Sequence, residues 1–131
     1  MKKPMPIQDY MSRTPRTIGY DIPLDTAKAM MKEHNIRHLP VLQGGKLVGV
    51  LSDRNVKSAL GFPGGEKFLV EDAMMPDVFS VGPEADLATT VEEMADEKYG
   101  CAIIEDEKGT VIGIFTTVDA CRVLAGLLKG C

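Results

Sequence analysis

The chain has 131 residues, of which 44% are apolar and 26% are charged, a composition typical of a globular domain. A net charge of −4 and an aromatic content of 5% argue against a general nucleic-acid binder, which needs a basic face and stacking rings. No apolar run approaches the about 20 residues that span a bilayer, so we expect no membrane association. Met1–Pro4 has no apolar run behind it, so we expect no signal peptide and a cytoplasmic location.

An internal repeat organises the sequence. Ile7–Met11 resembles Val70–Met74, which begins 63 positions later. Beyond the second hairpin turn the offset becomes 64, as Gly49 and Gly113 show, so we infer one added residue in that turn. The sequence therefore predicts a tandem duplication. Its parts are a first repeat at residues 5–62, a connector at 63–69 and a second repeat at 70–128.

Each repeat is predicted to contain the same elements in the same order. A short helical turn ends at Met11 or Met74, and a proline-containing bend follows it. The remaining elements are a brief strand (Arg16–Ile18 or Val78–Val81), an amphipathic helix (Leu24–His34 or Leu87–Lys98), a hairpin (Leu39–Leu42 with Lys46–Leu51, or Ala102–Ile104 with Val111–Phe115) and a closing helix from near Asp53 or Thr117.

This order predicts an α+β (α/β-like) fold class with two βαββα halves. Each half has about 60 residues, too few for a substantial core of its own. We therefore expect the halves to pack through their sheets about a pseudo-twofold axis. Gly61–Gly65 breaks the preceding helix and is expected to be a flexible connection.

A strand-to-helix junction occurs once in each repeat, at Gly49–Asn55 and at Gly113–Asp119. In both copies a glycine and two strand residues precede a hydroxyl residue, and a short polar residue follows three positions later. The hydroxyl suits a helix N-cap, and the free N–H groups of the helix start can hold a phosphate or a sugar. A plain helix cap without a ligand is the alternative for each copy. The duplication at equivalent places favours a ligand site.

Four segments have amino-acid sequences that resemble those of a known family. These segments are Ile36–Val41, Gly49–Asn55, Tyr99–Ile104 and Gly113–Asp119. Their order and duplication resemble the CBS domain, named for cystathionine β-synthase, in its tandem form, the Bateman module. The resemblance covers roughly residues 5–128. It implies two clefts for adenine-containing ligands, namely AMP, ADP, ATP or S-adenosylmethionine, and a regulatory rather than catalytic role with no required cofactor.

The resemblance also implies which residues contact the ligand. One site would use Ser80, Val81, Cys101, Ile103, Thr116, Thr117 and Asp119. The other would use Thr17, Ile18, Pro40, Ser52, Arg54 and Asn55. Arg37 and His38 match positions that supply cations to phosphates, although Arg37 can equally be a solvated charge. Because Asp119 has a carboxylate where Asn55 has a neutral amide, we expect the Asp119 site to bind about five- to tenfold more tightly.

Several other residues have plain structural interpretations. His34 and His38 straddle a helix end and a strand, so we expect no metal site. Cys101 and Cys121 are expected to be buried small hydrophobes, whereas the terminal Cys131 is expected to be exposed and prone to oxidation. Glu105–Glu107 is interpreted as a solvated turn.

Three functions compete. The leading hypothesis is a non-enzymatic adenine-nucleotide sensor; because no catalytic or DNA-binding domain accompanies the repeats, we expect its regulated protein to be a separate chain. The second is a dimerisation or interaction scaffold with vestigial ligand sites. An enzyme is not supported, because the sequence has no nucleophile–base pair, P-loop or G-x-G-x-x-G motif. The closing helix has more apolar residues than one internal face accommodates, which predicts a homodimer.

Overall fold

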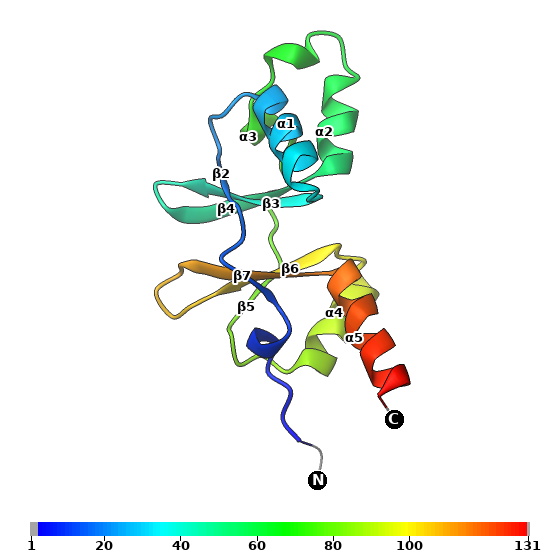
Figure 1. Cartoon of the computed structure of the whole chain (residues 1–131). Helices are drawn as coiled ribbons and strands as arrows, with labels where there is room; N and C mark the ends of the chain where they lie inside the picture. The colour runs from blue at the N-terminus through cyan, green and yellow to red at the C-terminus, as the bar shows by residue number, and fades with distance from the viewer. Residues whose placement is uncertain (1–2, 131) are drawn as a thin grey trace. The chain divides into compact units, whose positions relative to one another are not determined.

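The computed structural model describes residues 3–130, which fold as two compact units (Figure 1). Unit 2 is Arg16–Val78. Unit 1 combines the described residues up to Pro15 with those from Phe79 onward. The units therefore exchange a segment relative to the sequence repeats: the helical turn that opens each repeat packs on the core of the other repeat. Cys131, for which exposure was predicted, lies outside the described residues.

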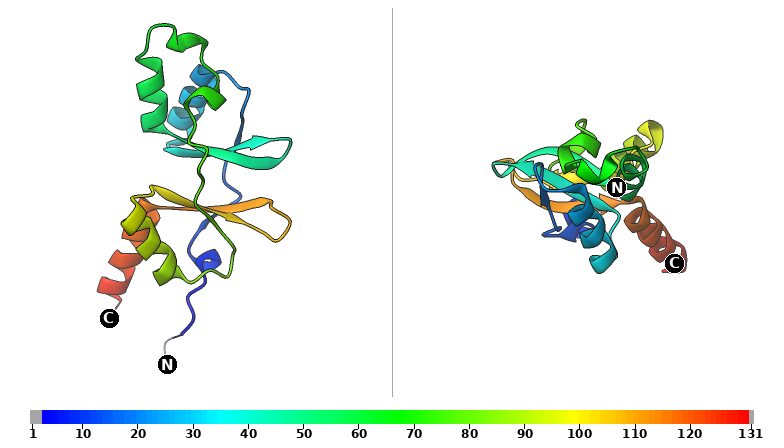
Figure 2. Two further views of the ribbon diagram at one scale, coloured as in Figure 1. Left: turned by 180° about the vertical axis from the view of Figure 1, so that it is seen from behind. Right: turned by 90° about the horizontal axis from the view of Figure 1, so that it is seen from above.

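Unit 2 is a three-stranded sheet with helices on one face (Figures 1 and 2). Its elements are β2 (Ile18–Gly19), α1 (Leu24–His34), β3 (His38–Gln43), β4 (Lys46–Ser52), α2 (Asp53–Leu60), the 3-10 helix η2 (Gly65–Lys67) and α3 (Val70–Ala73). The sheet order is β2-β3-β4, with β2 parallel and β4 antiparallel to β3. Its core includes Leu24, Leu39, Val41, Leu51 and Val70, all fully buried.

Unit 1 repeats this plan and adds an edge strand. Its elements are the 3-10 helix η1 (Ile7–Asp9), β1 (Ser12–Arg13), β5 (Ser80–Val81), α4 (Leu87–Glu97), β6 (Cys101–Glu105), β7 (Val111–Thr116) and α5 (Thr117–Lys129). The sheet order is β1-β7-β6-β5, with β5 parallel and β7 antiparallel to β6. The sequence prediction missed β1, which pairs antiparallel with β7. Ile7, Ala102, Ile104 and Phe115 are fully buried in its core.

Equivalent details confirm the duplication. Gly49 pairs with Val41 in unit 2, and Gly113 pairs with Ile104 in unit 1, with an irregularity of register beside each pair. A Cβ on Gly49 would lie 2.6 Å from the Met74 sulfur, and one on Gly113 would lie 2.2 Å from the Met11 sulfur. The exchanged segment thus docks on the sheet through the same methionine–glycine contact in both units. Glycine occupies these positions because no side chain fits beneath the methionine.

The long helix of each unit ends in the same way. α1 and α4 each end at a residue in the left-handed conformation, Asn35 (φ 52°) and Lys98 (φ 60°). The connector after α2 is more structured than a flexible linker, because Gly65 is buried at the start of η2. A Cβ on Gly65 would lie 2.4 Å from the Ala59 carbonyl oxygen, so the turn requires glycine.

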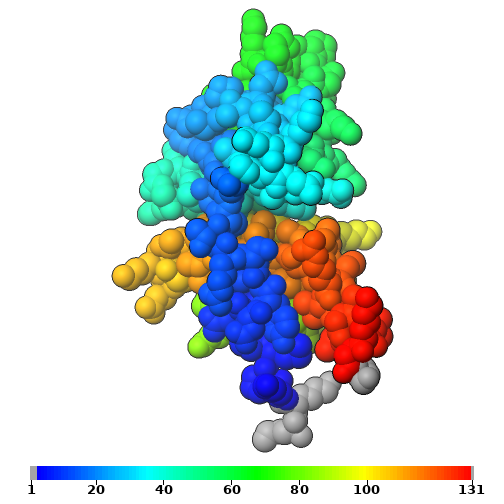
Figure 3. Space-filling model, viewed as in Figure 1, coloured from blue at the N-terminus to red at the C-terminus, as the bar shows by residue number. Residues whose placement is uncertain are grey.

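The C-terminal helix α5 projects at the surface of unit 1 (orange to red in Figure 3). None of its described residues is buried, and Val118, Leu124, Leu127 and Leu128 are 48–72% exposed. The prediction that Cys121 is buried is therefore wrong: this helix contacts its own sheet only through one side, and Cys121 lies on another. No described helix is both long enough and apolar enough to cross a membrane.

Candidate functional site

The two strand-to-helix junctions form the same capping box. In unit 2 the Asn55 N–H donates to Ser52 Oγ (3.0 Å), and the Ser52 N–H donates to Asn55 Oδ1 (3.0 Å). In unit 1 the Asp119 N–H donates to Thr116 Oγ1 (3.3 Å), and the Thr116 N–H donates to Asp119 Oδ2 (2.8 Å). The plain helix cap is therefore present at both junctions. A ligand would have to use whatever donor and acceptor capacity the cap leaves.

The hydrogen-bonding groups that the capping box leaves unused differ between the two junctions. In Asp119, Oδ2 accepts both the N–H and the hydroxyl of Thr116, while Oδ1 lies 3.9 Å from a guanidinium nitrogen of Arg122. The Asp119 side chain is only 13% exposed, whereas Arg122 is 79% exposed. In Asn55 the amide oxygen serves the cap, so its outward group is the NH₂ donor. Unit 1 thus offers a further anionic acceptor where unit 2 offers a neutral donor.

In unit 1 the sheet brings the predicted site residues onto one face. Cys101 is opposite Thr116, and Ser80 is opposite Ile103. Because side chains alternate along a strand, these residues lie on the face away from Ala102, Ile104 and the core. The Val81 side chain packs against the core instead, so only its backbone remains available to a ligand. Thr117 is exposed, and its N–H donates to the Gly100 carbonyl (3.1 Å).

Unit 2 places its predicted residues in the equivalent way. His38 is opposite Ser52, and the fully buried Pro40 is opposite Val50. Thr17 is half-buried, whereas the Ile18 side chain is a member of the core and has only its backbone to offer. Arg37 and Arg54 are exposed beside the start of α2. The Arg37 carbonyl accepts the Asp53 N–H (2.9 Å), which ties the two cations to this helix start.

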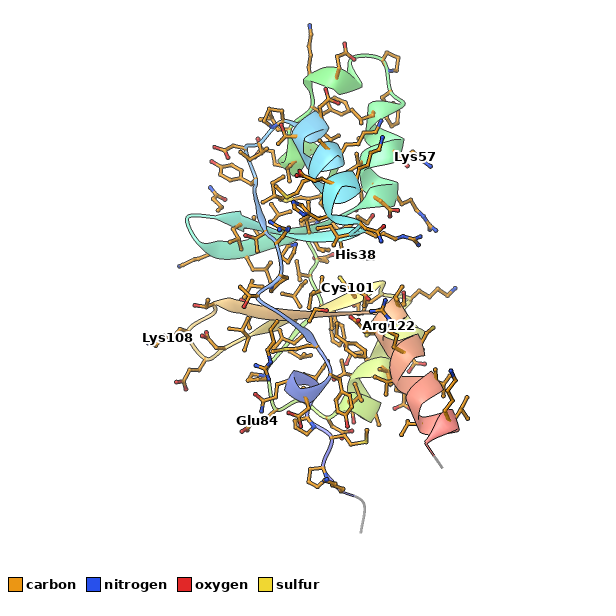
Figure 4. The ribbon with its side chains drawn as sticks, in the orientation of Figure 1. His38, Lys57, Glu84, Cys101, Lys108 and Arg122 are labelled. Atoms are coloured by element: carbon orange, nitrogen blue, oxygen red, sulfur yellow. The ribbon has the colours of Figure 1, made fainter. Side chains whose placement is uncertain are left out.

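Burial decides the charge of two equivalent residues, both labelled in Figure 4. Burial lowers the pKa of His38, an effect that nearby Arg37 reinforces and Asp53 opposes. Burial raises the pKa of Cys101 to about 12. The imidazole and the thiol are therefore both neutral at pH 7. Arg37 is the permanent charge of this pair, and the expectation that His38 supplies a cation to a phosphate stays a prediction.

The sequence analysis missed Glu105. It was interpreted with Asp106 and Glu107 as a solvated turn, but the three acids differ. Glu105 ends β6, is half-buried, and accepts a hydrogen bond from the Ser80 hydroxyl. Asp106 Oδ1 accepts the N–H groups of Lys108 and Thr110 at 2.9 Å each, which closes the turn. Only Glu107 is exposed without such a role in the turn. The alternation of positions 101, 103 and 105 was the available signal.

Two surface hollows lie apart from most of these residues. In unit 2 a hollow of about 360 Å³ is lined by Asn55, Ser58, Ala59, Phe62, Phe68, Asp72 and Ala73. In unit 1 a hollow of about 370 Å³ is lined by Pro4, Met5, Pro6, Gln8, Glu84 and Asp86. Asn55 is the one predicted site residue that lines either. Among the described residues, no group of three or more His, Cys, Asp or Glu side chains is placed to hold a metal ion.

Known proteins share the sequence pattern and the architecture of this chain. The model of the CBS domain matches residues 7–61 and again residues 70–126. An inosine-5′-monophosphate dehydrogenase from Korarchaeum cryptofilum is 32% identical over 86% of the chain, and an L-aspartate semialdehyde sulfurtransferase from Methanocaldococcus jannaschii is 27% identical over 96%. The chain spans about a quarter of the length of these relatives, 23% and 25% respectively.

Solved structures show the same fold. A Vibrio cholerae protein described as an acetoin utilization protein (AcuB) has a TM-score of 0.85 and 29% identity, covering 97% of this chain and 95% of its own. The CBS domain pair of protein MJ0100, crystallised with 5′-methylthioadenosine and S-adenosyl-L-methionine, has a TM-score of 0.83 and 25% identity, covering 95% and 98%. With two family matches and these similarities, the chain belongs to the CBS domain family, as a tandem pair of CBS domains.

Proposed function

We propose that this CBS pair is a non-enzymatic regulatory module that binds an adenosine-type ligand and acts on a separate partner protein. The observation that carries the proposal is the start of α5. There the half-buried Asp119 keeps Oδ1 outside the capping box, beside the first turn of the helix. A carboxylate oxygen accepts ribose hydroxyls, and a helix start favours phosphate. The adenosine ligands of the MJ0100 pair support the same ligand class.

Several ligands satisfy this chemistry: AMP, ADP, ATP and S-adenosylmethionine. All contain the ribose that Asp119 would hold, and they differ in the group attached at the 5′ carbon. Arg37, Arg54 and Arg122 are exposed cations of the described chain near the two helix starts, and they favour a phosphate over a sulfonium cation. We therefore rank the nucleotides above S-adenosylmethionine for this chain.

Regulation would arise from differential affinity. A ligand that binds one conformation of a CBS pair more tightly than another shifts the population toward it, and a bound partner senses that shift. The curated relatives are enzymes about four times as long as this chain, and the matched region is one part of each. The neutral Cys101 thiol and the neutral His38 imidazole offer no activated nucleophile–base pair.

A second function is a dimerisation or interaction scaffold whose ligand sites are vestigial. The exposed apolar residues of α5 favour it, since Val118, Leu124 and Leu128 are each about half exposed or more. Monomeric proteins seldom expose contiguous apolar patches larger than a few hundred Å². We propose that two copies of the chain pair through this helix. Dimer formation is compatible with ligand binding, so binding itself separates the two functions.

Calorimetric titration of the purified protein tests the proposal. AMP, ADP, ATP, S-adenosylmethionine and adenosine are titrated separately, with GMP as the control for the base. The sensor hypothesis expects saturable binding of at least one adenine nucleotide, with adenosine weaker because it lacks the phosphate. Absence of binding by all adenosine ligands would leave the scaffold as the surviving function.

A further inference from the structure

A surface hollow of unit 2 lies between α2, α3 and the connector that joins them. Its volume is about 360 Å³, toward the lower end of the range for small-molecule sites. Asn55, Ser58 and Ala59 lie on one side of α2, because residues three or four positions apart share a helix face. The full lining is Asn55, Ser58, Ala59, Phe62, Phe68, Asp72 and Ala73. The hollow is therefore formed within unit 2, by its last two α-helices and their connector.

The internal repeat explains why unit 2 is hollow at this place. In the helical turns that open the two repeats, Tyr10 is the counterpart of Ala73, 63 positions later. Tyr10 is half-buried and packs against the core of unit 1, as does Val123 of α5, the counterpart of Ala59. Ala73 is also half-buried and packs against the core of unit 2, but it has a methyl group in place of the ring. The hollow thus lies where unit 1 has an aromatic ring of its own chain.

Two phenylalanines give the hollow an aromatic lining. Phe68 is half-buried and packs against the core of unit 2. Phe62 is 64% exposed, so its ring is available to cover a bound molecule. Aromatic rings attract one another in offset-stacked or edge-to-face arrangements. An aromatic ring in the hollow would therefore gain more than the burial of apolar surface alone.

Asp72 adds a negative charge to this lining. The side chain is exposed, and its Oδ2 accepts the Leu69 N–H at 2.9 Å, which holds the carboxylate at the start of α3. Among the described residues, no Lys, Arg or His is recorded within salt-bridge distance of Asp72. A protonated amine donates to a carboxylate and is also attracted by the face of an aromatic ring. The charge of the hollow is thus complementary to a cationic molecule.

We propose that this hollow binds a small aromatic amine, a single ring with a protonated amino group. The ring takes the place that Tyr10 fills in unit 1 and packs against Phe62 and Phe68, and the ammonium group pairs with Asp72. The site is separate from the start of α5, which belongs to unit 1. The inference goes beyond the proposed function and does not depend on it.

Two probes test the ring and the charge separately. Tyramine has the phenol ring of tyrosine and an ammonium group, whereas 4-ethylphenol has the same ring without the ammonium group. Each is titrated into the ¹⁵N-labelled chain, and the amide signals are followed by nuclear magnetic resonance. We expect saturable shifts of the Ser58, Phe62 and Ala73 amides. Tyramine should bind about two- to fivefold more tightly than 4-ethylphenol, the level of an exposed ion pair.

Three variants change the lining and one leaves it intact. Ala73→Tyr supplies the ring that unit 1 has at Tyr10 and should remove saturable binding of both probes. Asp72→Asn keeps an oxygen for the helix cap and should make the two probes bind equally. Phe62→Ala should weaken both probes. Ala29→Tyr, at an exposed position of α1, is the matched control and should leave both affinities unchanged.

Circular dichroism checks that each variant folds. If Ala73→Tyr does not fold, Phe62→Ala and Asp72→Asn, both at exposed positions, carry the test. Absence of saturable shifts, or shifts that persist in folded Ala73→Tyr, would overturn the inference. Equal binding of the two probes by the wild type would overturn the role of Asp72. Shifts of the same amides on dilution without a probe would assign the hollow to a second copy of the chain and overturn the small ligand. None of these outcomes bears on the adenosine proposal, which rests on Asp119 in unit 1.

Discussion

Units 1 and 2 build the same capping box with different side chains, and the comparison separates folding from binding. Both boxes need one oxygen three residues after the cap, which Asp119 and Asn55 supply equally. The carboxylate of Asp119 is therefore not required by the helix start, because an amide performs that role in unit 2. Its second oxygen, Oδ1, takes no part in the box and lies 3.9 Å from a guanidinium nitrogen of the exposed Arg122. The repeat kept its local structure while the outward group of the box diverged.

A second pair of residues at equivalent positions also differs in chemistry while meeting the same structural requirement. His38 and Cys101 begin the central strands β3 and β6, opposite Ser52 and Thr116 respectively. Burial lowers the pKa of the histidine and raises that of the cysteine, so one physical cause leaves both side chains neutral. Two chemically different residues thus meet one requirement of the fold, a side chain that tolerates burial at this strand start.

The largest effect expected is on stability, from Ile7→Ala. Ile7 is fully buried in the core of unit 1, although it belongs to the first repeat by sequence. Truncating it should lower the free energy of unfolding by about 2–5 kcal/mol, measured by urea denaturation. Asp9→Ala, at an exposed position of the same 3-10 helix, should change it by about 0.5 kcal/mol or less.

Hydrogen exchange locates the effect of Ile7→Ala. Amides of β6, β7 and α5 should lose protection, because these elements share a unit with Ile7. Loss of protection confined to residues 16–62 would show that the helical turn stabilises its own sequence repeat, and the exchanged arrangement would then be wrong.

The second-largest effect expected is on nucleotide binding, and it differs between the two helix starts. Asp119→Ala should weaken the bound nucleotide about ten- to a hundredfold, because charge-assisted hydrogen bonds to the ribose are lost. Asn55→Ala should weaken it by less. Both variants lose the same capping interaction, about 1 kcal/mol of stability, so the Asn55 variant is a matched structural control. Asp119→Asn keeps the box oxygen and should weaken binding about five- to tenfold. Equal weakening by the two alanine variants would remove the asymmetry.

The third prediction concerns α5, which has a wider exposed apolar surface than α2. Replacing Leu124 and Leu128 together by Glu should halve the mass of the proposed homodimer in light scattering at micromolar concentration, because both residues are more than half exposed. Lys129→Glu alters the charge of the same helix without removing apolar surface and should leave the mass unchanged. A wild-type chain that is already monomeric would contradict the proposed interface.

The smallest effect expected is a pH dependence from His38. The pKa of this histidine is lower in the folded state than its ordinary value of 6.5, so below that value the unfolded state binds more protons. Stability should therefore fall as the pH drops below about 6.5. In thermal melts between pH 7.5 and 5.5, His38→Asn should show a flatter profile than the wild type. An unchanged slope would mean that the imidazole already has its ordinary pKa in the fold.

Local patterns predicted most of the secondary structure. α1, the two hairpins and the starts of α2 and α5 lie within one or two residues of their predicted bounds. These elements depend on interactions three or four residues apart, such as the capping boxes, or on strand alternation closed by a short turn. The candidate site was predicted less completely. Ser80, Cys101, Ile103 and Thr116 share one face as strand pairing requires, but Ile18 and Val81 direct their side chains into the cores.

The sequence alone determined the duplication, the order of the elements and the two capped helix starts. Each of these features depends on neighbouring residues or on their recurrence 63 or 64 positions later. Only the tertiary structure decided which unit holds each opening helical turn, the pairing of β1 with β7, the exposure of Cys121 and the contact of Ser80 with Glu105. These features join residues 25 or more positions apart, or depend on which side of a helix meets the sheet. Their energy comes from the fit between surfaces, which local propensity does not encode.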